Sequence, residues 1–142
     1  MLIEIREPGD RAVRQLVREL QAEMAGGDVT GSPDAIEFMI GLIDGKPVAC
    51  GALAQVGPGI GEVIQLYVRP SWRGQGLSRL ILAALEERAV ELGYQTLRSE
   101  ATPDGVRAVR LYEGSGFHTV PDQRSGAAGR ARYEKSLLPA LA

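Results

Sequence analysis

The chain has 142 residues, and 44% of them are hydrophobic, which is enough to bury the core of one domain. Its net charge is −2 and its pI is about 5.5, which argues against a broad basic surface for nucleic acid. The single cysteine, Cys50, excludes an internal disulfide and any cysteine-based zinc site, and its apolar neighbours indicate a buried, inert thiol. We therefore expect one domain, residues 1–142, with no nucleic-acid partner.

The N-terminal half predicts one helix among antiparallel strands. Apolar residues recur at helical spacing from Val13 to Met24, and Asp10 is placed to cap that helix. Alternation of apolar and polar residues, with a hairpin signal at Asp44-Gly45, indicates strands before and after the helix. The predicted strands are residues 1–5, 35–43, 47–56 and 61–68. Gly51 lies within the third strand, where it marks a bulge or a close approach of the backbone.

The C-terminal half predicts a crossover helix, a strand, a short helix and two last strands. The long helix covers residues 77–92 and ends at Gly93, with its apolar stripe formed by Leu77, Leu80, Ile81, Ala84, Leu85, Ala89 and Leu92. Because a helix connects them, the strand at 94–101 should run parallel to the strand at 61–68. The remaining predicted elements are a helix at 106–113, strands at 116–120 and 131–137, and a loop at 121–130. The sheet is therefore mixed.

No segment of the chain indicates export or a membrane. The first ten residues, MLIEIREPGD, include acidic side chains and lack the apolar segment of a signal peptide. The longest uninterrupted apolar run, LILAAL, is too short to cross a bilayer. We expect a cytoplasmic protein without membrane association.

The turn between the strand at 61–68 and the long helix has the features of a phosphate site. Gly74 and Gly76 let the backbone curl at the helix start, where unpaired N–H groups and the helix dipole favour an anion. Arg69, Arg73 and Arg79 surround this turn. An ordinary turn with solvated arginines is an equally good reading of the turn alone. The sequence fits neither the dinucleotide pattern G-x-G-x-x-G nor a P-loop.

Two motifs resemble the GNAT family of N-acetyltransferases. RGQGLS, residues 73–78, resembles the family's pyrophosphate loop Arg/Gln-x-x-Gly-x-Gly/Ala, with Ser78, also a small residue, in place of the final Gly or Ala. AVRLYEGSGF, residues 108–117, resembles the family's second signature, and the resemblance extends over roughly residues 60–118. It implies an α/β fold with a mixed, mainly antiparallel sheet that splays at its central parallel pair and is flanked by helices.

The resemblance also implies acetyl-CoA as co-substrate and no metal. It assigns the pantetheine arm to main-chain groups of Leu66, Tyr67 and Val68, one of which would polarise the thioester carbonyl. It assigns the pyrophosphate to the turn residues Arg73, Gly74, Gln75, Gly76, Leu77 and Ser78. Gly105 stands where the family often has an asparagine, so one customary cofactor contact differs.

Two residues are the catalytic candidates. Tyr112 matches the family tyrosine that donates a proton to the departing thiolate. Glu62 lies six residues before Val68, where several family members place a catalytic glutamate; alternation puts it on the face of Leu66 and Val68 unless a bulge changes the parity. An exposed carboxylate at the end of the strand is an equally good reading of Glu62, and Glu100 is the competing base.

The resemblance implies an N-acetyltransferase in which a primary amine attacks acetyl-CoA directly in a ternary complex. The alternative is a non-catalytic acyl-CoA-binding sensor or interaction module on the same scaffold. The acceptor is a small-molecule amine or a protein amine; Arg124, Arg130 and Arg132 suggest an acidic group on it, and a solvated loop explains them equally well. His118 is read as a structural or surface residue, and Trp72 either shields the phosphate site or is exposed. A homodimer is also possible, because members of the family that this chain resembles often dimerise.

Overall fold

The computed structural model describes residues 1–23, 35–101, 106–120 and 131–137. In these ranges the elements are β1 (Leu2–Arg6), α1 (Arg11–Glu23), β2 (Ala35–Ile43), β3 (Lys46–Gly57), β4 (Ile60–Val68), a 3-10 turn η1 (Pro70–Trp72), α2 (Leu77–Glu91), β5 (Thr96–Ala101), α3 (Val106–Gly114), β6 (His118–Val120) and β7 (Ala131–Ser136). The loop predicted at 121–130 lies outside the described residues, as do Gly105, Arg124 and Arg130.

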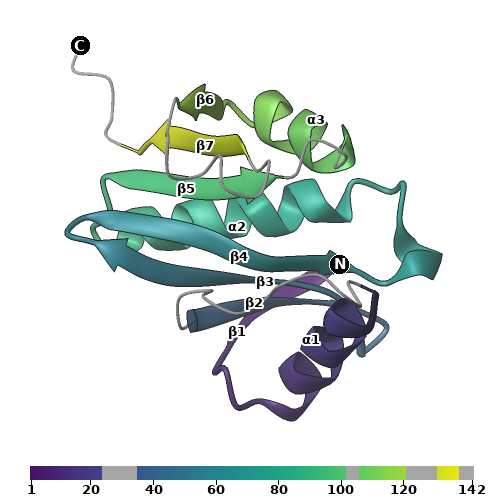
Figure 1. Cartoon of the computed structure of the whole chain (residues 1–142). Coiled ribbons are helices and arrows are strands. Elements are labelled where there is room, and N and C mark those ends of the chain that lie inside the picture. Colours follow the sequence, from purple (N-terminus) through teal and green to yellow (C-terminus); the bar gives the residue numbers. More distant parts are fainter. Residues whose placement is uncertain (24–34, 102–105, 121–130, 138–142) are drawn as a thin grey trace.

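The described strands form one mixed sheet in the order β1-β2-β3-β4-β5-β7-β6 (Figure 1). Neighbouring strands are antiparallel except β4 and β5, which are parallel as the helical crossover predicts. These two strands pair only from Ile60–Thr96 to Glu62–Arg98, although β4 continues to Val68 and β5 to Ala101. They therefore separate toward their C-terminal ends, which opens the sheet at its centre.

Each face of the sheet has its own core. Val13 and Leu16 of α1 pack with Phe38, Ile40 and other residues of one face. On the opposite face, α2 contributes more buried residues than any other element to a second cluster, which also contains Tyr112 of α3 and Tyr133 of β7. Helices α2 and α3 thus lie on one side of the sheet and α1 on the other.

The buried arc of α2 is rotated from the predicted stripe. Leu80 is 50% exposed, whereas Leu82, which was not assigned to the stripe, is completely buried. The cluster around α2 includes residues of β5, α3 and β7 as well as β3 and β4, so the helix is covered on more than one side. Leu92, at 41% exposed, lies just beyond the end of the helix at Glu91. The prediction that Leu80 and Leu92 belong to the buried stripe was therefore wrong.

A bulge in β4 decides which side chains face which core. Ala52 pairs with Ile64 and Cys50 pairs with Tyr67, so β4 contains one extra residue here, and Gln65 has a positive φ of 52°. Ile64 and Tyr67 consequently share the α1 face, while Leu66 packs against the α2 core. Glu62 lies on the face of Ile64 and Tyr67, so its predicted position on the face of Leu66 and Val68 was wrong and the bulge alternative is correct.

Gly51 faces this bulge and provides space for it. A Cβ at Gly51 would lie 3.0 Å from Leu66 Cδ1 and 2.9 Å from both Ile81 Cγ2 and Leu85 Cδ1. The close approach predicted for Gly51 is confirmed, because its missing side chain lets both the bulge and α2 contact β3.

The predicted helix ends are also confirmed. The Asp10 carboxylate accepts hydrogen bonds from the N–H groups of Ala12 at 3.0 Å and Val13 at 3.2 Å, which caps α1. Gly93, after α2, has a φ of 85°, which is the left-handed conformation expected of a glycine that ends a helix. No helix in the described ranges has the length and apolar character needed to cross a membrane.

Candidate functional site

The turn that leads into α2 has the predicted glycine conformation. Gly74 and Gly76 have φ angles of 82° and 78°, in the left-handed region that glycine adopts at little cost. Gly76 is the N-cap of α2 and has no side chain with which to bond the amides of the first turn. These N–H groups and the positive end of the helix dipole therefore suit an anionic ligand.

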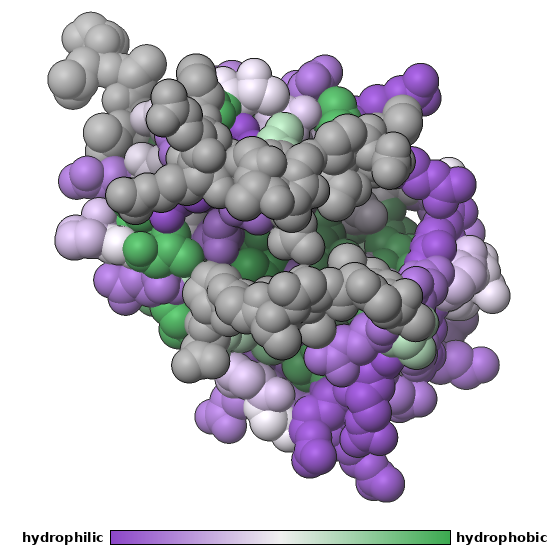
Figure 2. Space-filling view, in the orientation of Figure 1, coloured by the Kyte–Doolittle hydropathy of each residue, from purple (hydrophilic) through white to green (hydrophobic). Residues whose placement is uncertain are grey.

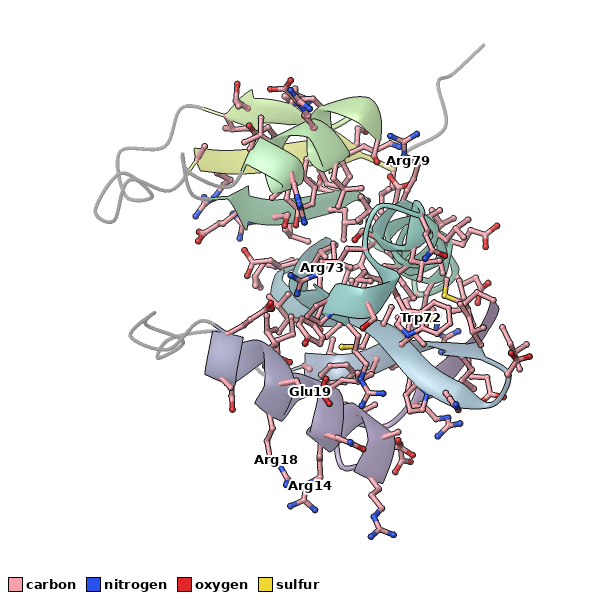
Figure 3. The ribbon with its side chains drawn as sticks, turned by 90° about the vertical axis from the view of Figure 1, so that its right-hand side faces the viewer. Arg14, Arg18, Glu19, Trp72, Arg73 and Arg79 are labelled. Atoms are coloured by element: carbon pink, nitrogen blue, oxygen red, sulfur yellow. The ribbon has the colours of Figure 1, made fainter. Side chains whose placement is uncertain are left out.

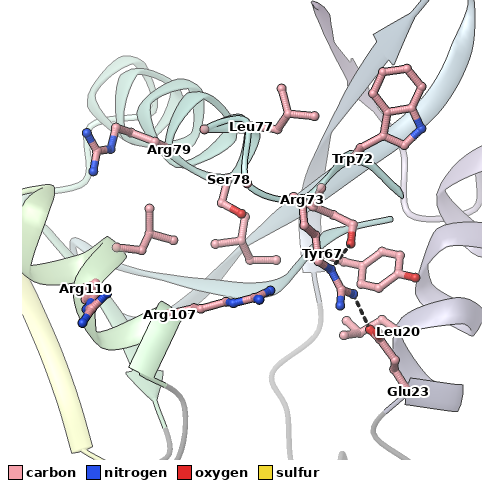
Figure 4. Close-up of a pocket in the computed structure, with 15 residues that line it drawn as sticks. Leu20, Glu23, Tyr67, Trp72, Arg73, Leu77, Ser78, Arg79, Arg107 and Arg110 are labelled. Carbon is pink, nitrogen blue, oxygen red and sulfur yellow. Dashed lines mark hydrogen bonds and ion pairs between the residues drawn. The ribbon is translucent and has the colours of Figure 1, made fainter. Parts of the chain in front are cut away.

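This turn forms one wall of a cavity of about 720 Å³ (Figure 4). The end of β4 forms the floor through Leu66, Tyr67 and Val68, and residues of α3 and the end of α1 complete the lining. All of the predicted cofactor residues line this cavity except Gln75, which is exposed and is not part of the lining. Trp72 also lines it and is partly buried against the α2 core.

Four arginines line the cavity, two of which sequence reasoning missed. Arg73 and Arg79 come from the turn and from α2, and Arg107 and Arg110 come from α3. Positions three apart on a helix share a face, so the spacing of Arg107 and Arg110 was the available signal. Several guanidinium groups around one cavity favour a ligand with more than one phosphate group.

Arg69, which was expected beside this site, is occupied elsewhere. Its Nε and Nη2 donate to the two carboxylate oxygens of Glu19 at 3.0 and 2.8 Å, and its Nη1 donates to the Pro47 carbonyl at 2.8 Å. Arg69 therefore joins α1 to the end of β4 and is absent from the cavity lining. That part of the prediction was wrong.

Arg73 connects the turn with α1. Its Nε donates to the Val68 carbonyl at 2.9 Å, and its Nη2 donates to the Glu23 carboxylate at 2.6 Å (Figure 4). The guanidinium also lies over the Tyr67 ring, 5.7 Å from its centre. Glu23 thus places a negative charge in a cavity whose other charged lining residues are arginines, at the arginine that a phosphate would contact.

Tyr112 lies where β4 and β5 separate. It is 5% exposed, and its hydroxyl forms a hydrogen bond with Ser99 of β5, whose own hydroxyl lies 3.4 Å from the Val63 carbonyl of β4. Burial raises the pKa of the Tyr112 phenol, the Ser99 bond lowers it, and the nearby charge of Glu62 raises it. Tyr112 does not line the cavity itself, but its neighbour Leu111 does. A phenol that stays protonated here can act as a proton donor.

Glu62 lies on the α1 face, within electrostatic range of Tyr112. Burial raises the pKa of the Glu62 carboxyl and the charge of Glu100 adds to this, while Arg98 and Arg132 oppose it. A carboxylate with a raised pKa is a better proton acceptor than an ordinary surface carboxylate. The competing candidate, Glu100, is exposed and has the Arg132 guanidinium 3.9 Å away.

The other residues singled out in the sequence lie away from the cavity. Cys50 is completely buried between β2 and β4, and burial raises the pKa of its thiol to about 12, so the expected buried, inert thiol is confirmed. His118 is exposed at the start of β6. Neither side chain is in a position to act on a ligand of the cavity.

Sequence comparison relates this fold and cavity to known proteins. The acetyltransferase (GNAT) family model matches residues 6–117. A relative named IAA acetyltransferase, from Azospirillum brasilense, is 31% identical over 124 residues, which cover 78% of this chain and 79% of the relative. The mycothiol acetyltransferase of Mycobacterium marinum is 42% identical over 69 residues, but the match covers only 44% of this chain and 22% of that protein.

Solved structures share the architecture over nearly the whole chain. A Klebsiella pneumoniae structure described as an acyl-CoA N-acyltransferase has a TM-score of 0.81 at 29% identity, covering 96% of this chain and 97% of that one. A Bacillus subtilis acetyltransferase in complex with CoA has a TM-score of 0.72 at 15% identity, covering 96% and 98% of the two chains. With the glycine turn before α2 and the diverging β4 and β5, these matches show that the chain belongs to the acetyltransferase (GNAT) family and is an acyltransferase.

Proposed function

We propose that this protein transfers an acetyl group from acetyl-CoA to a primary amine by direct attack in a ternary complex. The observation that carries the proposal is the cavity that joins the glycine turn and its arginines to the end of β4, beside the point where β4 and β5 diverge. Phosphates bound at the turn would leave the pantetheine arm running along β4 toward that opening. CoA in the related Bacillus subtilis acetyltransferase structure supports the same donor.

The chemical step needs a proton acceptor and a proton donor on opposite sides of the thioester. The amine nitrogen attacks the thioester carbonyl, and a main-chain N–H of residues 66–68 stabilises the oxyanion. Glu62 accepts the proton that the amine loses, directly or through water, and the C–S bond then breaks. Tyr112 gives its proton to the departing thiolate of CoA and is reprotonated from solvent. Glu62 on the α1 face and Tyr112 on the α2 face flank the opening from two sides.

The relatives do not identify the chemical class of the acceptor, because their names refer to different substrates. Their names specify IAA and mycothiol acetylation, and a structural neighbour is an N-acetylglutamate synthase bound to CoA and N-acetylglutamate, at 20% identity and a TM-score of 0.75 over 97% of this chain and 36% of that one. The acceptor in our proposal is therefore a small-molecule or protein amine.

The function is tested by release of free thiol from acetyl-CoA in the presence of a library of amines. We expect turnover that depends on the amine, with Tyr112→Phe lowering kcat by about 100-fold and leaving the KM for acetyl-CoA nearly unchanged, since proton transfer contributes this much to rate. Binding of acetyl-CoA without turnover of any amine would support the sensor instead. An unchanged kcat in Tyr112→Phe would remove this residue from the mechanism.

The phosphate role of the turn is tested by Gly76→Ala. An added Cβ at this position meets no atom within 4 Å, so steric contact is not the cause of any effect. The φ of residue 76 is 78°, a conformation that costs an L-residue about 1 kcal/mol, so alanine favours a different backbone conformation of the turn. We expect the Kd for CoA, measured by calorimetry, to rise about ten-fold or more. Gly45→Ala is the matched control, because Gly45 has a φ of 75° and equally open space in the β2–β3 hairpin. Equal effects of the two variants on CoA binding would contradict a phosphate role.

The place of Glu23 in the cavity predicts that it weakens donor binding. Glu23→Gln removes the charge that competes with phosphate for Arg73, so we expect CoA to bind several-fold more tightly. Glu19→Gln, one helical turn earlier, frees Arg69 instead and should leave CoA affinity almost unchanged because Arg69 does not line the cavity. Weaker CoA binding by Glu23→Gln would instead assign Glu23 to holding Arg73 in its binding position.

The raised pKa of Glu62 predicts an acid limb in the pH dependence of amine transfer. A raised pKa means that the carboxyl keeps its proton to higher pH, so kcat/KM for the amine should fall on acidification above the range of an ordinary glutamate. Glu62→Gln should lower kcat and abolish this limb, while Glu100→Gln should keep it. Loss of the limb in the Glu100 variant alone would make Glu100 the base.

A further inference from the structure

A cluster of charged side chains lies on the α1 face where β4 and β5 last pair. Glu62 and Arg98 are partners in that last pair, so their side chains leave the sheet on the same face. Alternation places Glu100 on this face as well, and its β7 partner is Arg132. Arg98 in turn pairs with Glu134 of β7. The cluster, defined as Glu62, Arg98, Glu100, Arg132 and Glu134, therefore contains three carboxylates and two guanidinium groups beside the proposed transfer site.

Arg98 is the member of the cluster that the fold does not use. Its Nε is buried and has no hydrogen-bond partner, and within the described residues its guanidinium forms no ion pair. Two other arginines of the protein bridge elements through two-pronged bonds, Arg69 with Glu19 and Arg88 with Glu37. A buried N–H without a partner is unfavourable, so its presence here calls for a ligand that satisfies it.

The geometry of a guanidinium group selects the chemistry of such a ligand. Its planar array of donors matches a carboxylate, which accepts two parallel hydrogen bonds. Glu62, on the neighbouring strand about 4.8 Å away at the backbone, offers the opposite charge to a protonated amine. A molecule with an amino group and a carboxylate separated by a few bonds would satisfy both side chains together, whereas a simple amine would leave Arg98 without a partner.

We propose that the acceptor is a small amino carboxylate, whose carboxylate is bound by Arg98 while its amino group lies at Glu62. This inference rests on the proposed acetyl transfer and specifies its acceptor class. Arg98 is then a specificity-determining residue, because it contacts the part of the acceptor that does not react. Its charge also opposes the raised pKa of Glu62, so a change at Arg98 should shift the acid limb of the rate as well as the choice of substrate.

The test compares amino carboxylates with their carboxamides in the acetyl-CoA thiol-release assay. The probes are the standard L-amino acids, β-alanine and 4-aminobutyrate, each beside its carboxamide, with every rate divided by the fraction of unprotonated amine. We expect kcat/KM to favour the best carboxylate over its amide by about ten-fold or more, and Arg98→Gln to remove that preference. Arg98→Lys, which keeps the charge without the planar fork, should retain part of it.

The control is Arg14→Gln, which removes one positive charge from the outward face of α1 (Figure 3) and should preserve the preference. Thermal unfolding of each variant separates loss of preference from loss of the fold. Equal rates for carboxylates and carboxamides in the wild type, or a preference that survives in Arg98→Gln, would overturn the inference.

If no probe is acetylated, binding of the same pairs to the CoA complex is measured by calorimetry. If carboxylates bind, and if Arg98→Gln weakens this binding by ten-fold or more, the anion site at Arg98 is supported although the proposed acetyl transfer is not. Absence of binding by both members of every pair would overturn the acceptor class.

Discussion

The site depends on the separation of two parallel strands. β4 and β5 share only three residue pairs before they diverge, and the bulge at Gln65 lies three residues beyond the last of them. A bulge bends a strand and increases its local twist, so it favours this divergence. The opening leaves main-chain groups of β4 without a partner on β5, which is what a ligand running along β4 requires. Gly51 makes the arrangement sterically feasible because the bulge and α2 both pack where its side chain would be.

Charge is distributed differently on the two sides of this opening. The outward face of α1 is hydrophilic (Figures 2 and 3), and the carboxylates of Glu19 and Glu23 on the same helix bind Arg69 and Arg73. The charged residues that line the cavity on the proposed donor side are four arginines and one glutamate, which suits a polyanion. The proposed acceptor side holds three carboxylates, including Glu62, and two guanidinium groups, which suits a ligand carrying both charges. The two half-sites thus differ in the chemistry they can recognise.

Local patterns predicted the elements well because each depends on neighbouring residues. Alternation and helical spacing placed the strands and helices to within a few residues, Asp10 and Gly93 marked helix ends, and Asp44-Gly45 marked a hairpin whose two residues both have positive φ. The failures are of another kind. Leu80 is exposed and Leu82 is buried, contrary to the prediction, because the burial of α2 depends on which elements cover its sides. Arg69 lies outside the predicted site because Glu19, fifty residues away in the sequence, binds its guanidinium.

The sequence by itself determined the sheet, the glycine turn at a helix start, and the candidates Tyr112 and Glu62, because short motifs record backbone requirements and residue types. Only the tertiary structure decided which face Glu62 occupies, that Arg107 and Arg110 join Arg73 and Arg79 in one cavity, and that the Nε of Arg98, beside Glu62, has no hydrogen-bond partner among the described residues. The physical reason is that the face a side chain occupies depends on one inserted residue in β4, and that the neighbours and partners of a side chain depend on contacts between segments far apart in the chain.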